Sequence, residues 1–110
     1  MERRINQRAR TDFGVIASEG IYESVCRGIE ISTSGIVLDR GREVVEEDKR
    51  LFFGLEICLP ERHAALFAVA RPVWHFGSQQ AFRIIEMSDV DRLNIAEHVD
   101  LRRQGGAWLS

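Results

Sequence analysis

The sequence predicts a mostly β protein, a six-stranded antiparallel barrel followed by one C-terminal α-helix. Three observations lead to this fold class. Short apolar stretches with strand-like patterns recur between residues 13 and 87, and one stretch of helical periodicity follows residue 88. A chain of 110 residues has room for one domain. A small closed barrel leaves no exposed strand edge and can be plugged by an amphipathic helix, so we favour it over an open sandwich.

The first three strands are expected at residues 13–18, 21–32 and 36–39. Glu19 and Gly20 form the turn between the first two strands, and Ser34 or Gly35 opens the third. In the second strand, Ile29 and Ile31 are expected to point into the core. Residues 39–50 mix charges of both signs around Gly41, which predicts a solvated loop.

The fourth strand, 51–59, alternates clearly between two faces. Its core face is expected to hold Leu51, Phe53, Leu55, Ile57 and Leu59. A fifth strand follows at 66–74, where Pro72 predicts an edge position or a bulge, and a sixth at 82–87.

The single helix is expected at residues 88–104. Ser88 and Asp91 form an S-x-x-D capping pattern, and Gly105 and Gly106 end the helix. An apolar stripe is predicted along one helix face, at Val90, Leu93, Ala96 and Val99. The domain therefore divides into four parts: an arm at 1–10, the barrel at 11–87, the helix at 88–104, and a tail at 105–110 that folds back.

The sequence favours a cytoplasmic protein. No stretch is apolar enough to cross a bilayer, and the arginines of the first ten residues are not followed by the apolar core of a secretory signal. In a reducing cytoplasm, Cys26 and Cys58 are expected to be free thiols.

Neither an enzyme nor a bound cofactor or metal is expected. His63, His75 and His98 share no metal-ligand spacing with the cysteines. The chain also lacks a nucleophile-elbow sequence and a Walker-type glycine-rich loop, which disfavours acyl transfer and nucleotide hydrolysis.

The basic residues are almost all arginine, and they gather at the start of the chain. The net charge is −2, but the first ten residues hold four arginines against one glutamate, and only Lys49 is a lysine. Arginine's planar fork suits bidentate recognition of phosphate or base edges. The alternative is a solvated tail. The arm has one apolar residue, Ile5, so we expect a ligand to order it.

Two clusters carry most of the information about function. Arg4-x-x-x-Arg8 precedes the first strand, and Glu30, Ser32 and Gly35 lie where the second strand meets the third. Glu30 and Ser32 are two apart on a strand and share a face, while a glycine permits a positive φ or a close backbone approach. Arginine donates to phosphate and to the O6/N7 edge of guanine, and a carboxylate accepts from its N1–H and N2–H₂ edge. This set therefore suits a guanine nucleotide; the alternative is surface ion pairs beside an ordinary turn.

These residues resemble the PilZ domain family, a bacterial receptor module for cyclic di-GMP. The family pattern is R-x-x-x-R in an N-terminal arm, then (D/N)-x-S-x-x-G about twenty residues later. This chain has Arg4-Ile5-Asn6-Gln7-Arg8 and Glu30-Ile31-Ser32-Thr33-Ser34-Gly35. Arg71-Pro72-Val73-Trp74 is similar to the family's VW strand, and residues 81–93 resemble its last strand and helix, so the resemblance covers nearly the whole chain. Two residues depart from the family: Glu30 replaces Asp or Asn, and Ala81 replaces a common glycine.

The resemblance implies a PilZ-like barrel that binds cyclic di-GMP. It assigns Arg4 and Arg8 to phosphate and guanine contacts, Glu30 and Ser32 to guanine-edge or phosphate contacts, and Gly35 to backbone clearance. Arg3, directly before the arginine pair, implies an intercalated ligand dimer. Trp74 is expected to be half-buried in the barrel, with a place beside the site as the alternative.

Without an output domain, such a receptor would pass its signal to a protein partner. The main alternative is a degenerate PilZ-like interaction module with weak or no nucleotide binding, which the longer side chain of Glu30 would favour. Single-stranded RNA binding through the arm is disfavoured because the chain is net acidic and lacks exposed aromatic pairs for base stacking.

Overall fold

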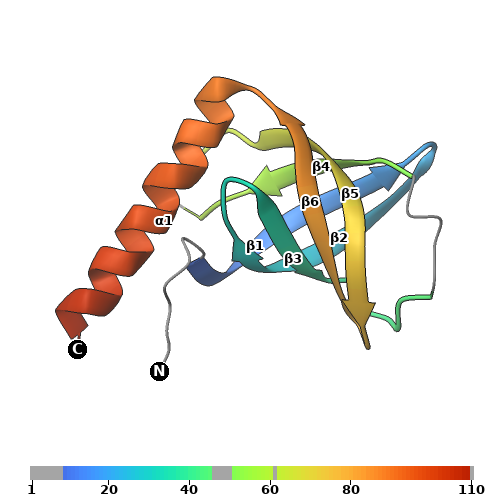
Figure 1. The fold of residues 1–110 in the computed structure, drawn as a ribbon, viewed down its shortest axis with the longest axis horizontal. Coiled ribbons are helices and arrows are strands. Elements are labelled where there is room, and N and C mark those ends of the chain that lie inside the picture. Colours follow the sequence, from blue (N-terminus) through green and yellow to red (C-terminus); the bar gives the residue numbers. More distant parts are fainter. Residues whose placement is uncertain (1–8, 46–50, 61, 110) are drawn as a thin grey trace.

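The computed structural model describes residues 9–45, 51–60 and 62–109, with side chains for 13–45, 51–60 and 62–101. Six antiparallel strands close into a barrel in the order β1-β2-β3-β6-β5-β4, and one helix follows (Figure 1). The predicted fold class is confirmed. The elements are β1 Ala9–Glu19, β2 Tyr22–Ile31, β3 Gly35–Asp39, β4 Phe53–Cys58, β5 Leu66–Phe76, β6 Gln79–Met87 and α1 Asp89–Leu109.

The barrel interior is filled by the inward-facing residues of the strands. The predicted alternation of β4 is confirmed: Phe53, Leu55, Ile57 and Leu59 are buried and Leu51 packs against them. The rings of Phe53 and Phe82 meet edge to face at 5.1 Å. Burial of these apolar side chains is the main force that holds the barrel closed.

Two backbone predictions on the strands are confirmed. Gly20 turns the chain between β1 and β2 with a φ of 63°, a conformation that glycine adopts without steric cost. The turn consists of Gly20 and Ile21, because Glu19 still pairs with Tyr22 at the end of β1. The pairing of β5 with β6 shifts register between Pro72 and Trp74, which is the bulge that the proline predicted.

The loop after β3 is not fully solvated, contrary to the prediction for residues 39–50. Arg40 and Val44 are buried. The Arg40 guanidinium donates to Gln80 Oε1 and, at 3.1 Å, to Ser24 Oγ, and it lies 5.7 Å from the centre of the Phe53 ring. Buried polar partners and an aromatic face can replace water around a guanidinium, a possibility that the charge pattern did not reveal.

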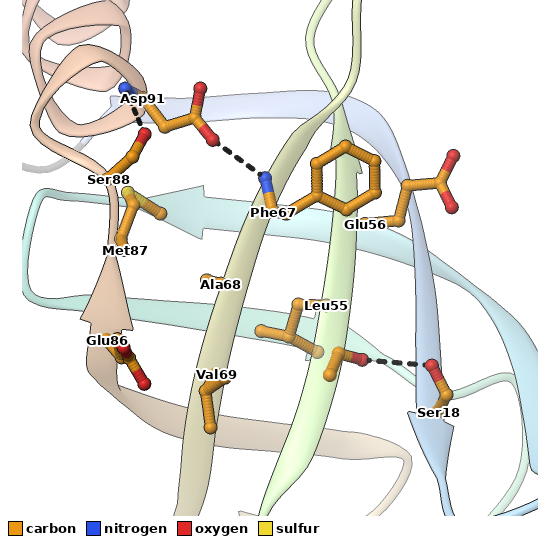
Figure 2. Close-up of a pocket in the computed structure, with 11 residues that line it drawn as sticks. Ser18, Leu55, Glu56, Phe67, Ala68, Val69, Glu86, Met87, Ser88 and Asp91 are labelled. Carbon is orange, nitrogen blue, oxygen red and sulfur yellow. Dashed lines mark hydrogen bonds between the residues drawn. The ribbon is translucent and has the colours of Figure 1, made fainter.

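The helix begins as predicted but faces the barrel with other residues. Ser88 Oγ accepts the backbone N–H of Asp91 at 3.1 Å, which confirms the cap. Ile95, His98 and Val99 are buried, whereas Val90 and Leu93 are exposed. The predicted stripe is therefore wrong at Val90 and Leu93 and correct at Val99, while Ala96 is partly buried. Asp91 lies on the buried residues' side of the helix, four before Ile95, and accepts the Phe67 N–H at 3.1 Å (Figure 2). This link to β5 sets the rotation of the helix.

Both ends of the domain differ from the expected division. α1 continues to Leu109, so Gly105 and Gly106 do not end it and residues 105–109 are not a separate tail. A glycine inside a helix lowers helix stability by about 1 kcal/mol relative to alanine. The four helical turns that precede Gly105 are enough for the helix to continue despite this loss. At the other end, Ala9 and Arg10 belong to β1 rather than to an arm, because they pair with Ile31 and Glu30.

Within the described residues, α1 is too polar to cross a bilayer as a helix.

Candidate functional site

The strand register places the residues that follow the first sequence cluster opposite the second cluster. Ala9, the residue directly after the R-x-x-x-R segment, pairs with Ile31, and Arg10 pairs with Glu30. Ile31 stands between Glu30 and Ser32, so the arginine segment joins the barrel next to the second cluster. Arg3, Arg4 and Arg8 themselves lie outside the described residues.

A bulge in β2 sets the direction of Glu30. The register with β3 shifts between Gly28 and Glu30, so Gly28 and Ile31 are both buried. Ile29 is only partly buried, contrary to the expectation that it points into the core with Ile31. Glu30 is partly exposed on the outer surface of the barrel. Sequence alternation alone misses such a bulge, because one inserted residue reverses the pattern.

Ser32 is buried and holds the corner between β2 and β3. Its Oγ accepts the backbone N–H of Ser34 at 3.2 Å and that of Gly35 at 3.1 Å, and its own N–H donates to the Gly35 carbonyl at 2.8 Å. Only 6% of Ser32 is exposed. The Ser32 hydroxyl therefore stabilises the turn, and in this way it fixes the backbone conformation at the corner.

Gly35 has no positive φ, so of its two predicted roles only the close approach remains. A Cβ at this position would stand 3.1 Å from the carbonyl oxygen of Phe82, which is tighter than ordinary contact. β6 also donates the Ile84 N–H to the Ser34 carbonyl at 2.9 Å. The glycine lets β3 and β6 meet closely at the corner.

A row of paired residues links this corner to Trp74 across the outer surface. Glu30 pairs with Val37, Val37 with Ala81, and Ala81 with Trp74. Directly paired residues share a face, and three strand spacings make the row about 14 Å long. Trp74 is 47% exposed, which confirms the expected half-burial, and it lies on the same surface as Glu30. The small side chains of Val37 and Ala81 form an apolar floor between them, and both residues are largely covered, with 7% of each exposed.

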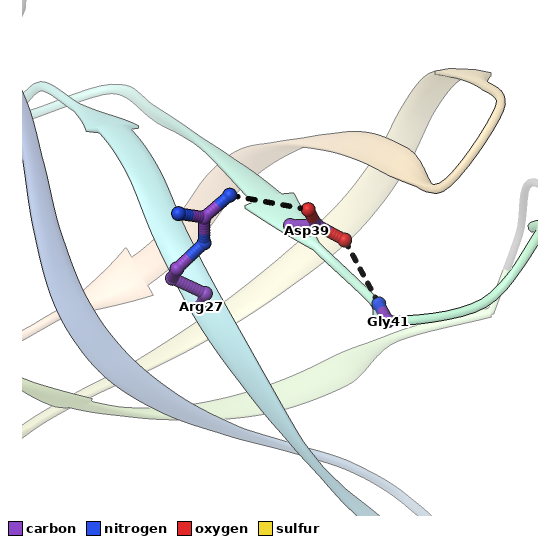
Figure 3. A network of polar contacts seen from close by, with 3 residues as sticks. All are labelled: Arg27, Asp39 and Gly41. Atoms are coloured by element: carbon purple, nitrogen blue, oxygen red, sulfur yellow. Dashed lines mark hydrogen bonds and ion pairs between the residues drawn. The ribbon is translucent and has the colours of Figure 1, made fainter.

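At the far end of β3, exposed polar groups form hydrogen bonds and an ion pair with one another. Asp39 accepts the Gly41 N–H at 2.9 Å and forms an ion pair with Arg27 at 3.3 Å (Figure 3). The Gly41 N–H, the Ser78 hydroxyl and the Arg27 guanidinium lower the pKa of the Asp39 carboxyl. This end therefore satisfies its own charges and marks a limit of the candidate site.

The helix is tied to the corner by one side chain. The Arg92 guanidinium in α1 donates to the carbonyl oxygen of Thr33, between Ser32 and Ser34. Sequence analysis missed this contact, because an arginine in the first turns of a helix has no signature that names its partner.

A groove beside the start of α1 is unsuited to binding phosphate. It is lined by residues of β4, β5 and β6, by Ser18 of β1 and by the start of α1 (Figure 2). Glu56, Glu86 and Asp91 make it acidic. β4 and β5 stand opposite β3 and β2 in the closed strand order, so this groove is separate from the Ser32 corner.

The histidines and cysteines do not gather. In the described part of the chain, no three His, Cys, Asp or Glu side chains could hold one metal ion. His98 is buried against the edge of the Phe13 ring at 6.4 Å, and both Cys26 and Cys58 are free.

Comparison with known proteins supports the architecture. No family model matches the chain, and no curated protein sequence does. Among solved structures, the Bacillus subtilis inhibitor of motility (MotI/DgrA) superposes with a TM-score of 0.79 at 17% identity. The match covers 96% of this chain and 53% of that one, so this chain spans about half its length. The shared fold is the barrel with its C-terminal helix, as the resemblance to the PilZ family implied.

Proposed function

We propose that this protein binds cyclic di-GMP at the Ser32 corner and passes the signal to a protein partner. The observation that carries the proposal is the pairing of Ala9 with Ile31 and of Arg10 with Glu30. The two residues that directly follow the first cluster thus lie beside the second cluster, and the PilZ resemblance assigns both clusters to the ligand.

Each group has a chemical role in this proposal. Arg4 and Arg8 donate to phosphate oxygens and to guanine O6/N7, while Glu30 accepts from the guanine N1–H and N2–H₂ edge. Ser32 and Gly35 shape the backbone against which the nucleotide lies. Arg3 contacts a second, intercalated nucleotide, and Trp74 borders the site at the end of the Val37–Ala81 floor.

The signal leaves the site by contact rather than by chemistry. The Arg92 link to the Thr33 carbonyl connects the ligand corner to α1, which gives the ligand a route to a surface that a partner reads. The inhibition of motility named for the structural neighbour is the kind of output that a contact-acting regulator produces. A non-enzymatic cytoplasmic receptor fits this set of features.

The test is calorimetric titration with cyclic di-GMP of the natural chain, Arg8→Ala and Arg10→Ala. Loss of one charge-assisted contact costs about 1.5–3 kcal/mol, so Arg8→Ala should weaken binding by about ten- to a hundredfold. Arg10→Ala removes the same charge outside the R-x-x-x-R pair, and because Arg10 stands opposite Glu30 we expect a loss of affinity that is smaller than for Arg8→Ala. Equal effects of the two substitutions would contradict the assignment.

The second candidate is a PilZ-like interaction module without useful nucleotide affinity. Glu30 favours it, because the extra methylene displaces the carboxylate by roughly 1 Å from where Asp or Asn would place it. If calorimetry detects no heat of binding with cyclic di-GMP and the chain still melts cooperatively, that result supports this candidate over the first.

A further inference from the structure

A second outward row of the barrel carries two arginines beside the corner. Gly35 pairs with Arg83 on β6, and Arg83 pairs with Arg71 on β5. Their strand neighbours Ile84 and Ala70, which pair with each other, are buried, so Arg83 and Arg71 lie on the outer face. This row is next to the one that holds Glu30, Val37, Ala81 and Trp74.

Arg71 and Arg83 are directly opposed residues of adjacent strands, and two like charges in such a pair are unfavourable. Both line an open groove on the outer surface, together with Pro72, Val73 and Ile85. Arg71 is held over the Phe52 ring, with its guanidinium carbon 5.6 Å from the ring centre. Arg83 is exposed and makes no ion pair with any residue that the structure describes. Arg83 thus presents a positive charge at this groove with which an anion can pair.

The spacing fits a nucleotide whose base lies on the first row. Arg83 lies two strands away from Glu30 across the sheet, a distance of about 10 Å. Along the strand direction it is displaced by two residues, or about 7 Å, to the next residue that faces outward. Glu30 and Arg83 have long side chains that can shorten this distance, and one nucleotide with its base and phosphate spans the remainder. Gly35, without a side chain, leaves the path between them open.

We propose that Arg83, with Arg71 beside it, contacts a phosphate group of the bound cyclic dinucleotide. This inference rests on the proposed function and adds a contact outside both sequence clusters. Because Arg83 is exposed and forms no ion pair with a described residue, its removal should weaken binding without lowering the stability of the ligand-free chain. A surface arginine with only a solvating or packing role would not show this pair of effects.

The experiment uses the full chain with Arg83→Ala, Arg83→Lys and Arg42→Ala, titrated with cyclic di-GMP and melted without ligand. Arg42 is an exposed arginine in the loop after β3, at the far end from Gly35, and serves as the matched control. Arg83→Ala should weaken binding by about ten- to a hundredfold and reduce its salt dependence, while its ligand-free melting temperature stays equal to or above that of the natural chain. Arg83→Lys keeps the charge but loses the planar guanidinium, so its affinity for cyclic di-GMP should lie between that of the natural chain and that of Arg83→Ala.

The outcomes separate this inference from the proposed function. If the natural chain binds cyclic di-GMP and Arg83→Ala binds like Arg42→Ala, the phosphate contact is wrong and the receptor function stands. If Arg83→Ala weakens binding but also lowers the ligand-free melting temperature, the arginine supports the fold and the contact is again wrong. If the natural chain does not bind, both ideas fail together.

Discussion

The two ends of β3 use the same turn chemistry for different purposes. At one end Ser32 Oγ accepts the Gly35 N–H at 3.1 Å, and at the other Asp39 accepts the Gly41 N–H at 2.9 Å. At the Asp39 end, the neighbouring cation, Arg27, pairs with the same carboxylate (Figure 3). At the Ser32 end, Arg83 adds positive charge beside Gly35, and the arginine segment of the chain enters β1 there.

The difference shows that a polar turn does not by itself indicate a binding site. Both turns satisfy their backbone groups, so both could be read as structural. What distinguishes the Ser32 end is a surplus of positive charge around a corner of fixed shape. Each prediction below changes one end, or the strand that joins them to the rest of the barrel.

Deletion of residues 1–8 should have the largest effect on the Ser32 end. It removes Arg3, Arg4 and Arg8 but leaves Ala9 and Arg10, which pair with β2. Two lost charge-assisted contacts cost about 3–6 kcal/mol, so calorimetry should detect no binding of cyclic di-GMP. The ligand-free melting temperature should stay close to that of the full chain. Full affinity after deletion, or a truncated chain that does not fold, would contradict the role given to the arm.

Gly28→Ala should damage both ends, because Gly28 lies in β2 between Arg27 and Glu30. A Cβ there would stand 2.1 Å from Cε2 of Phe13, whose ring is buried against His98. The ring has little room to move, so we expect a loss of about 3 kcal/mol in the free energy of unfolding, measured by urea denaturation. Gly14→Ala in β1 is the control, because nothing lies within 4 Å of its added Cβ. Similar losses for both substitutions would contradict the steric explanation.

Substitution of Glu30 should change affinity at the Ser32 end by a smaller amount. Glu30→Ala removes one acceptor for the guanine edge and should weaken cyclic di-GMP binding about tenfold. Glu30→Asp shortens the side chain to the family's usual length and should tighten binding. Glu23→Ala, an exposed glutamate near the other end of β2, is the matched control. An unchanged dissociation constant for Glu30→Ala would place the carboxylate outside the site.

Strands with regular alternation, β4 above all, were predictable from sequence because their burial follows a period of two. The alternation of β4 and the Pro72 bulge depend on local patterns that neighbouring residues determine. The β2 bulge at Ile29 was not predictable, because it appears only when β2 pairs with β3. The helix face was missed for a related reason: Asp91 and Arg92 orient α1 through contacts with Phe67 and Thr33, which are distant in sequence.

The site was predictable in part. The sequence pattern named Glu30, Ser32 and Gly35, and the register places Ala9 and Arg10, which follow the R-x-x-x-R segment, opposite Ile31 and Glu30. It could not show that Ser32 is buried within its turn, nor that Arg83 lies beside Gly35. Cross-strand neighbours depend on register, and no spacing along the chain reports it.

The Asp39 end should respond to pH rather than to ligand, and by the smallest amount. The folded-state pKa of Asp39 lies below its ordinary value of 3.8, so as the pH falls the unfolded chain takes up the proton first. Its stabilising contribution is therefore complete above the ordinary value and is lost as the pH falls through the lower folded-state pKa. Asp39→Asn should melt slightly below the natural chain at pH 7, and the difference should vanish in acid. Arg27→Gln should retain most of this pH dependence, because the Gly41 N–H is the main cause of the shift. A deficit of Asp39→Asn that stays constant into acid would show that the carboxylate charge contributes nothing to this end, and a change in cyclic di-GMP affinity would show that the two ends are not separate.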